Sequence, residues 1–404
     1  MAFELTTLGA VVDIRGGGTP ATDDPRFWNG DIPWVSPKDM KSDEISASAD
    51  WITQAAIENS AASLIPPGAV LAVVRSGILA RTVPVGVTTR PLAVNQDIKA
   101  LCPGPRILPR FLFYFLLASE PALLARVSRG ATVHRLSTDD LRNLPLLLPS
   151  LPEQKRIVAI QDEAFEGIRI ASANAEKNLA NARELFEQML TREFGAIDAE
   201  RRQLRDVYAF KNGINFSGAE KGDVGVPTID VLNMYGKSTG VATSNLYRVN
   251  KTISKEWLLA HGDILVVRSS VKREGVGRAC HYVATPEPTT YCGFLIRGRP
   301  AVEVDSIYAT FFLRSRAVRA ELVRRATQAT ITNINQTILG DIQMPLPRLE
   351  EQLRVVDRLQ RLSSDLMSLE RSIEVRRSHL AALRSSILAR AFSGQLTATK
   401  GLAA

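Results

Sequence analysis

The sequence has little cysteine and histidine for its 404 residues, with three of the first and four of the second. Cys102, Cys280 and Cys292 are odd in number and lack CxxC spacing. Neither a disulfide framework nor a zinc site is expected, because both need paired or clustered ligands. The three thiols are predicted to be buried as small apolar groups, and no metal is expected on this chain.

Long hydrophobic runs are also missing. The most apolar run, residues 111–118, is far short of the roughly 18 to 20 residues that a membrane span needs. The N-terminus lacks a basic segment that leads into an apolar one. With 45% hydrophobic and 23% charged residues, the composition is that of a folded globular protein. We therefore expect a cytoplasmic protein that does not contact a membrane.

The common catalytic motifs are absent as well. The sequence contains no GxxxxGK[ST] phosphate loop, no HExxH zinc motif and no GxSxG nucleophile elbow. The glycines at 16–18 precede Thr19 and Pro20 and predict a turn rather than a dinucleotide-binding loop. No catalytic activity is expected from this chain by itself.

Positive charge is concentrated in one part of the chain. Residues 1–150 carry 14 basic and 14 acidic side chains, whereas residues 196–348 carry 21 and 14. Most of the net charge of +8 therefore belongs to the second of these segments. Nucleic-acid-binding proteins share such localised charge, although charge also serves solubility alone.

A tandem repeat organises the sequence. The segment LLLPSLPEQKRIVAI (146–160) has its counterpart in MPLPRLEEQLRVVDRL (344–359), 198 positions later. Upstream, PGAVLAVVRSG (67–77) matches HGDILVVRSS (261–270), and GDIPWVSPKDM (30–40) matches GVPTIDVLNM (225–234). We infer a duplication in which each copy has a mixed first part and a helical second part.

The helical parts show a heptad pattern. In the second copy its apolar positions are Val355, Leu359, Leu362, Leu366, Leu369, Ile373, Leu380, Leu383 and Ile387. The equivalent positions of the first copy include Ile157, Gln161, Ala164, Ile168, Ala171, Ala175, Ala182, Leu185 and Met189. Because an alanine-rich seam lets a leucine-rich helix approach closely, the two helices are predicted to pair with each other. The alternative is two separate amphipathic helices, each lying on its own domain.

The first part of each copy is predicted to be mixed α/β. Short strands are expected within 71–77, 84–89 and 97–103, and again within 263–270, 276–284 and 293–298. Helices are expected over 107–126 and 305–325. Proline-rich exits at 145–152 and 345–347 lead from each globular part into its long helix.

Several motifs, taken in order, carry a family resemblance. They are GGGTP (16–20), GDIPWVSPKDM (30–40), VVRSG (73–77), VNQDIKAL (94–101), LPEQKRIV (151–158) with its repeat, and ILARAFSGQL (387–396). In this order, and with the duplication, the chain resembles the specificity (S) subunit of type I restriction–modification systems over nearly its whole length.

The resemblance implies an α+β fold. Two mixed α/β target recognition domains in tandem repeat are expected, joined by two long helices that pair as an antiparallel coiled coil. The expected division is 1–150 for the first target recognition domain, 151–195 for the first conserved spacer helix, 196–348 for the second domain, 349–397 for the second spacer helix and 398–404 for a C-terminal tail.

The resemblance also implies a function. Such a subunit reads a bipartite, asymmetric site in double-stranded DNA and positions other subunits on it. The implied partners are two modification (methyltransferase) subunits that methylate adenine and, for cleavage, ATP-driven restriction subunits. No cofactor is expected on this chain, because S-adenosylmethionine and ATP are expected on those partners. An alternative is a helical-hairpin scaffold or adaptor without DNA specificity.

A DNA reader places Arg, Lys, Asn, Gln and Ser side chains at base edges and basic groups at phosphates. The candidates in the first domain are Ser36, Lys38, Asp39, Arg75, Ser76, Arg81, Asn95, Gln96 and Arg135. Those in the second domain are Asn233, Tyr235, Arg268, Ser269, Ser270, Lys272, Arg273, Asn333 and Asn335. The Arg-Ser pair after each Val-Val strand is the preferred prediction, because both copies keep it.

Two observations limit these predictions. Each candidate could instead be a solvated loop side chain or a turn-forming hydrogen-bond partner. The second copy has Cys-Gly-Phe-Leu-Ile (292–296) where the first has Gln-Asp-Ile-Lys, which argues against a contact surface there in the second domain.

Overall fold

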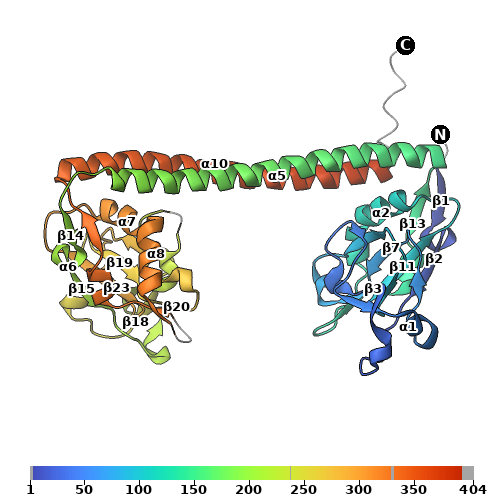
Figure 1. The fold of residues 1–404 in the computed structure, drawn as a ribbon, viewed down its shortest axis with the longest axis horizontal. Helices are drawn as coiled ribbons and strands as arrows, with labels where there is room; N and C mark the ends of the chain where they lie inside the picture. Colours follow the sequence, from blue (N-terminus) through green and yellow to red (C-terminus); the bar gives the residue numbers. More distant parts are fainter. Residues whose placement is uncertain (1–2, 237, 329–331, 394–404) are drawn as a thin grey trace, which may run out of the picture. The chain divides into compact units, whose positions relative to one another are not determined.

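The computed structural model describes residues 3–236, 238–328 and 332–393. The chain forms two compact units, one of Met1–Ala173 with Arg376–Ala404 and one of Asn174–Val375. Each unit combines a globular part with the beginning of one long helix and the end of the other (Figure 1). The expected tail at 398–404, and the end of the 387–396 motif, lie outside the described residues.

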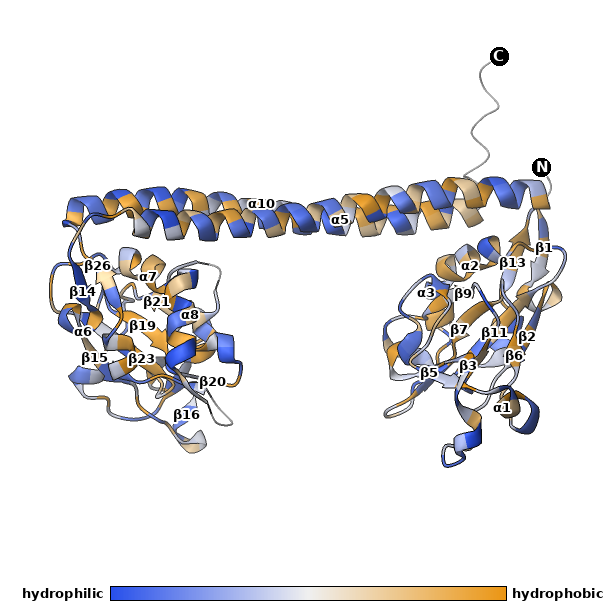
Figure 2. Ribbon diagram, viewed as in Figure 1, coloured by the Kyte–Doolittle hydropathy of each residue, from blue (hydrophilic) through white to orange (hydrophobic). Residues whose placement is uncertain are grey.

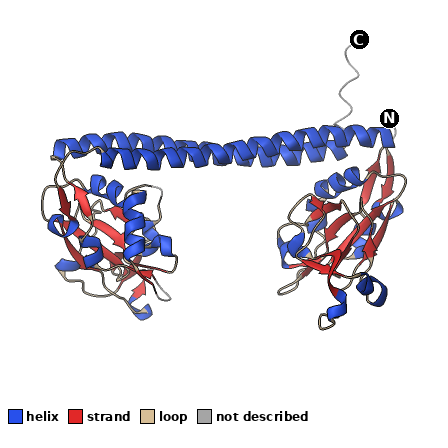
Figure 3. Ribbon diagram, viewed as in Figure 1, coloured by secondary structure: helices blue, strands red, loops and turns tan. Residues whose placement is uncertain are grey.

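The first globular part contains two main sheets (Figure 3). The larger sheet has the order β2 (Val12–Gly16), β11 (Ile98–Pro103), β7 (Val70–Val73), β9 (Val85–Thr88) and β4 (Glu44–Ile45). The smaller has the order β5 (Asp50–Ile52), β3 (Trp28–Val35), β10 (Leu92–Val94) and β6 (Leu64–Ile65). Two further pairs join β1 (Glu4–Thr7) to β13 (Pro145–Leu148), and β8 (Arg75–Ser76) to β12 (His134–Arg135). The short helices are α1 (Gln54–Asn59), α2 (Pro109–Ala118), α3 (Glu120–Leu124) and α4 (Thr138–Arg142).

The core of this globule explains the most apolar run of the sequence. All six residues from Phe111 to Leu116 in α2 are buried, so this helix is apolar on every side because protein surrounds it. The strand β7 is likewise buried on both faces. Within the described ranges, no helix is long and apolar enough to cross a membrane.

The second globular part repeats this plan with different strand lengths. One sheet has the order β15 (Tyr208–Asn212), β23 (Leu295–Pro300), β19 (Ile264–Val267) and β21 (Ala279–His281). Another has the order β16 (Lys221–Gly222), β18 (Tyr247–Val249), β17 (Val226–Ile229) and β22 (Thr290–Tyr291). A third consists of β20 (Ser269–Ser270), β25 (Thr332–Asn333) and β24 (Thr327–Gln328), and β14 (Arg201–Gln203) pairs with β26 (Gln343–Pro345). The helices are α6 (Leu204–Val207), α7 (Ser306–Arg314), α8 (Arg316–Arg325) and α9 (Gln336–Gly340).

The predicted α+β fold is confirmed, with one difference in its helices. Each segment predicted as a single helix, 107–126 and 305–325, is two helices. The first segment breaks at Ser119, and Pro121 lies in the first turn of α3, where its missing N–H costs no helical bond. The second breaks at Ser315, whose ψ of 145° is not helical.

Two long helices, α5 (Leu151–Gly195) and α10 (Leu349–Phe392), each contribute one part to each unit, and within a unit the two parts pair antiparallel, as expected (Figures 1 and 2). In the second unit, ion pairs of 2.7 Å join Arg183 to Glu370 and Glu193 to Arg358. In the first unit, the Arg384 guanidinium of α10 lies over the Phe165 ring of α5, 4.8 Å from its centroid.

The heptad pattern differs from the structure at two positions. Leu185 is 57% exposed and Leu383 is 49% exposed, so both lie at the margin of the helix pair. An α-helix drifts by about 20° per heptad relative to a strict 3.5-residue repeat. Phe186 and Leu388, rather than Leu185 and Leu383, pack into the apolar clusters of their units. The remaining predicted seam residues are buried or half-buried, namely Ile157, Ala164, Ile168, Leu359, Leu362, Leu366, Leu369, Ile373 and Leu380.

A buried glutamine fixes the start of each long helix. The Gln154 carboxamide accepts from the N–H of Leu108 and donates to the carbonyl oxygens of Arg106 and Pro149, all at 2.9 Å. Gln352 repeats this arrangement, because it accepts from the Asp305 N–H at 2.9 Å and donates to the Pro347 oxygen at 2.8 Å. Each carboxamide thus ties a long helix to its proline exit and to the loop before a helix of its globule.

Replacing Gln352 with leucine should destabilise the protein by about 2 kcal/mol or more, because the Asp305 N–H and the Pro347 carbonyl would be left buried without a partner. Gln154→Leu should act similarly in the first unit. Thermal unfolding measures the loss. The exposed Gln360 provides the control, since Gln360→Leu should leave the midpoint nearly unchanged. Equal losses of stability in Gln352→Leu and Gln360→Leu would contradict the structural role of Gln352.

Gln161, one turn after Ile157, has the opposite character. It is fully buried, and within the described part of the chain neither its amide nitrogen nor its amide oxygen has a hydrogen-bond partner. We predict that Gln161→Leu raises the free energy of unfolding by about 1–2 kcal/mol by removing that desolvation cost. Denaturant melts compared with those of Gln188→Leu, an exposed position of α5, measure the gain. A loss of stability would contradict the prediction.

Candidate nucleic-acid interface

In the first globule, several predicted site residues meet at one sheet edge. Because β3 and β10 run parallel, with Val35 beside Val94, the residues that follow them lie together. The Asn95 N–H donates to the Val35 oxygen at 3.0 Å. The Arg75 N–H donates to the Asp97 oxygen at 3.2 Å. We call the edge formed by Ser36, Asn95 and Arg75 the first recognition edge.

The second globule builds the same edge from its own copy. The strands β17 and β22 run parallel, with Ile229 beside Tyr291. The Cys292 N–H donates to the Ile229 oxygen at 2.9 Å, and the Arg268 N–H donates to the Phe294 oxygen at 2.8 Å. Asp230, Phe294 and Arg268 therefore form the second recognition edge. The repeat in the sequence is a repeat of this geometry.

The preferred Arg-Ser pair lies at the start of a separate short strand in each copy, with Arg75 as the first residue of β8 and Arg268 directly before β20. Arg75 pairs with Arg135 across β8 and β12, although these residues are 60 positions apart. Ser269 pairs with Asn333 across β20 and β25, and its hydroxyl donates to the Asn333 side-chain oxygen. The structure thus brings together candidates that the sequence could only name separately.

Other candidates take part in local hydrogen bonds. Ser36 and Asp39 form a capping box around the 3-10 helix η3 (Pro37–Asp39), with their side chains 2.9 Å apart. The Asn95 amide contacts the Asp97 carboxylate at 3.1 Å. Two more candidates form turns or caps, since the Asn233 oxygen accepts from the Asp230 N–H and the Asn335 oxygen accepts from the Ile338 N–H. Their geometry is the turn-forming alternative that the sequence left open.

The remaining candidates present their side chains to solvent or to their neighbours. Lys38 contacts Asp50 at 2.7 Å, and Gln96 accepts from the Thr19 hydroxyl at the same distance. Ser76 caps the 3-10 helix that follows it. The exposed basic candidates are Lys38, Arg75, Arg81, Arg135, Lys272 and Arg273, and Arg268 is half-buried.

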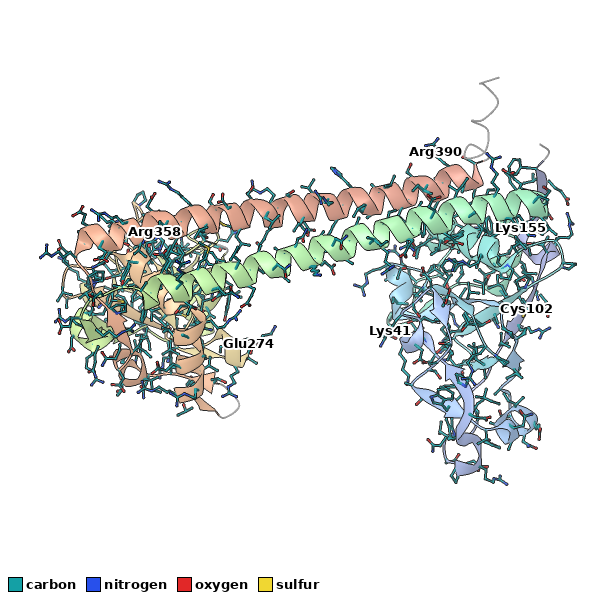
Figure 4. The ribbon with its side chains drawn as sticks, turned by 45° about the horizontal axis from the view of Figure 1, so that its top comes forward. Lys41, Cys102, Lys155, Glu274, Arg358 and Arg390 are labelled. Carbon is teal, nitrogen blue, oxygen red and sulfur yellow. The ribbon has the colours of Figure 1, made fainter. Side chains whose placement is uncertain are left out.

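An open cavity of about 620 Å³ lies at the second recognition edge. Its walls include the predicted Tyr235, Ser269, Ser270 and Lys272, together with Glu274, which Figure 4 marks at the surface of this globule. The walls also include three apolar residues that sequence reasoning missed, Val231, Val271 and Phe294. We call this cavity the apolar recess.

Three arginines fasten the loops around the recess. Arg278 donates to the main-chain oxygens of Met234 and Gly236 at 2.6 and 2.8 Å. Arg319 donates to those of Glu274 and Val276. Arg314 donates to the oxygens of Ala279 and Ser238 at 2.6 and 2.9 Å. We call these three residues the arginine clamp.

Burial disfavours the charged forms of two clamp residues, Arg319 and Arg278. Desolvation, followed by repulsion from Arg278, lowers the pKa of Arg319 to about 10. Desolvation and the nearby Arg314 lower the pKa of Arg278 as well. The positive charge of residues 196–348 is therefore partly internal. Arg297 is only 6% exposed and donates to the Glu256 oxygen, and Arg299 pairs with the buried Asp263 at 2.7 Å.

His281 provides a pH test of this region. Desolvation, followed by the charge of Arg314, lowers the pKa of His281 below its ordinary value of 6.5. The folded protein therefore holds the ring neutral, and its stability is complete above pH 6.5 and falls as the unfolded chain gains a proton below that pH. His281→Gln should lose less stability between pH 7 and pH 5 than the parent chain. Parallel slopes in denaturant melts would contradict this.

Metal-ligating side chains do not cluster in the described part of the chain. Among the described residues, no three His, Cys, Asp or Glu side chains could hold a metal ion. The three cysteines are buried and form no disulfide, as expected. Burial, followed by the charge of Asp230, raises the pKa of the Cys292 thiol to about 12.

Comparison with known families matches both copies of the repeat. The model of the type I restriction modification DNA specificity domain aligns with residues 2–179 and again with residues 197–377. The chain belongs to this family. The likeness to type I specificity subunits noted in the sequence is thereby confirmed, and each match contains one recognition edge.

Individual relatives agree with this membership. The EcoR124I/EcoR124II specificity subunit of Escherichia coli is 37% identical over 163 residues, which span 40% of this chain and 40% of that subunit. The StySPI specificity subunit of Salmonella potsdam is 26% identical over 324 residues, which span 74% of this chain and 68% of that one.

Two solved structures share the fold. A chain from a type I R-M system matches with a TM-score of 0.77 at 18% identity and 98% coverage of both chains. The HsdS subunit from Thermoanaerobacter tengcongensis matches with a TM-score of 0.57 at 19% identity, with 98% of this chain and 97% of that one covered.

Proposed function

We propose that this chain is the sequence-specific DNA-recognition subunit of a type I restriction–modification complex and that it reads a bipartite, asymmetric site. One observation carries the proposal, namely that the chain builds the same recognition edge twice and fits it with different side chains. Asp97 lies beside Arg75 at 3.8 Å in the first copy, whereas Phe294 lies beside Arg268 in the second. Two unlike readers on one chain would recognise two unlike half-sites.

The contacts with DNA follow from the side chains at these edges. Arg75 and Arg135 face each other across a strand pair. Lys272 lines the apolar recess, and Arg268 and Arg273 are next in sequence to residues that line it. Arginine binds guanine through two parallel hydrogen bonds in the major groove, and lysine and arginine neutralise phosphates. The candidates that cap turns act by holding these edges in shape.

The proposed partners follow from family membership. The chain would assemble with two modification subunits that methylate adenine and, for cleavage, with ATP-driven restriction subunits, in the cytoplasm where the DNA is accessible. S-adenosylmethionine and ATP would bind to those subunits, and this chain would contribute recognition without catalysis. The absence of catalytic motifs from the sequence supports this division. A pure scaffold would not need two such edges.

Mapping methylated adenines in a host with and without this gene tests the function. We expect a split, asymmetric motif that disappears with the gene. Exchanging residues 196–348 for the corresponding segment of a relative should change one half of the motif, because recognition of separated base pairs is roughly additive. A continuous or palindromic motif, or a chimera with both halves altered, would refute two separate readers.

Alanine at Arg268 or Arg75 tests the edges themselves. If the guanidinium reads a guanine, the change should cost about 1–3 kcal/mol of binding free energy and relax specificity at one position. A phosphate contact predicts even weakening across sequences and a smaller salt dependence. Binding titrations at several salt concentrations separate the two. Arg169, which pairs with Glu166 on α5, gives the matched control Arg169→Ala. Unchanged binding by both edge variants would show that the two arginines only hold strand ends.

A further inference from the structure

The second recognition edge is apolar at positions where the first is charged. The repeat aligns Leu232 with Lys38. Phe294 takes the place of Asp97 of the first copy. The Phe294 oxygen accepts from the Arg268 N–H as the Asp97 oxygen accepts from the Arg75 N–H. Lys38 and Asp97 have charged partners, Asp50 and Arg75. The two copies therefore present different chemistry on one frame.

These apolar side chains are unusually open to solvent. Leu232 is 84% exposed and Val271 is 83% exposed. Phe294 and Tyr235, which line the apolar recess with Val271, are 48% and 45% exposed. Leu232 is not itself in the lining of the recess, but it follows Val231, which is. A lone exposed leucine would need no explanation, whereas exposed apolar side chains at and beside one cavity mark a binding site.

The shape of this surface is set in advance. A Cβ atom at Gly275 would collide with the hydroxyl groups of Ser270 and Tyr235, so glycine lets this loop close against the recess wall. The arginine clamp holds the main chain on both sides, at Met234 through Arg278 and at Glu274 through Arg319. The apolar side chains therefore stand on fixed main chain, which favours a specific contact over a nonspecific one.

The surroundings of the surface identify its occupant. Lys272 and Arg273 are exposed beside Val271, so the surface is apolar with a basic margin. A basic margin fits phosphates, and the apolar centre then needs an apolar group on a base edge. The thymine 5-methyl group is the apolar feature that the major groove presents among otherwise polar atoms.

We propose that Leu232 and Val271 read a thymine in the second half-site by contact with its 5-methyl group in the major groove. This inference rests on the proposed function of the chain in DNA recognition. It assigns the second half-site at least one A·T pair at a fixed position. The first domain, with Lys38 at the equivalent place, does not use this contact.

Replacing single thymines by deoxyuridine tests the contact, because deoxyuridine keeps every hydrogen bond and lacks the methyl group. The probe is a duplex with the motif found by methylation mapping, bound by the full chain with its modification subunits. We expect one or two positions in the second half-site at which deoxyuridine weakens binding by about fourfold or more, as burial of one methyl group predicts. Any effect of deoxyuridine in the first half-site should not depend on Leu232 or Val271.

Two variants link the effect to the residues. In Leu232→Ala and Val271→Ala, the affinity ratio between thymine and deoxyuridine duplexes should fall toward one, with an unchanged salt dependence. Both side chains are exposed, so their truncation leaves the fold intact. Val224→Ala is the matched control, because Val224 is also an apolar residue of this domain, 71% exposed, and lies in a different loop, between β16 and β17.

The outcomes are separable. Specific binding that no deoxyuridine in the second half-site weakens overturns the methyl contact and leaves the proposed function standing. A 2-aminopurine beside the thymine reports whether the bases stay stacked. If the bound protein unstacks it and Leu232→Ala does not, the side chain is wedged between bases, and the proposal is overturned. Failure to bind any sequence preferentially would reject the proposed function itself.

Discussion

A single buried carboxamide in each copy sets the position of the elements around it. Gln154 and Gln352 satisfy main-chain groups from the proline exit and from the loop before the first apolar helix of the globule. A long helix that starts without such a partner could swing about its proline-rich connection. The short strand pairs β1 with β13 and β14 with β26 close each globule beside this joint, so the sheets, and with them the recognition edges, are built on a fixed base.

The duplication keeps this frame and varies the surface. Parallel strands end together at Val35 and Val94 in the first copy and at Ile229 and Tyr291 in the second. Residues after the ends of parallel strands meet at one edge in either copy. Two side chains there differ in kind, since the first copy has Lys38 and Asp97 where the second has Leu232 and Phe294. Conserved geometry with diverged chemistry is what a reader of two different sequences on one molecule requires.

Much of the fold could be predicted from the sequence because its signals are local. Short apolar runs separated by proline and glycine predicted the strands, and the heptad predicted the long helices, apart from the exposed Leu185 and Leu383. The candidate site was less predictable because it depends on pairing between distant segments. The strand pair of Arg75 with Arg135, and the capping role of Ser36 and Asp39, need the folded chain. The charge of the second domain also misleads in part, since several of its arginines point inward.

The arginine clamp bears on how such a protein changes its target over generations. Arg278, Arg314 and Arg319 grip main-chain oxygens, and a carbonyl oxygen is the same whichever residue carries it. Substitutions of the exposed side chains Leu232 and Val271 therefore leave these hydrogen bonds in place. The hydrogen bonds that support the loops are thus separate from the exposed side chains that would contact DNA. A single substitution of such a side chain can change specificity without removing the support.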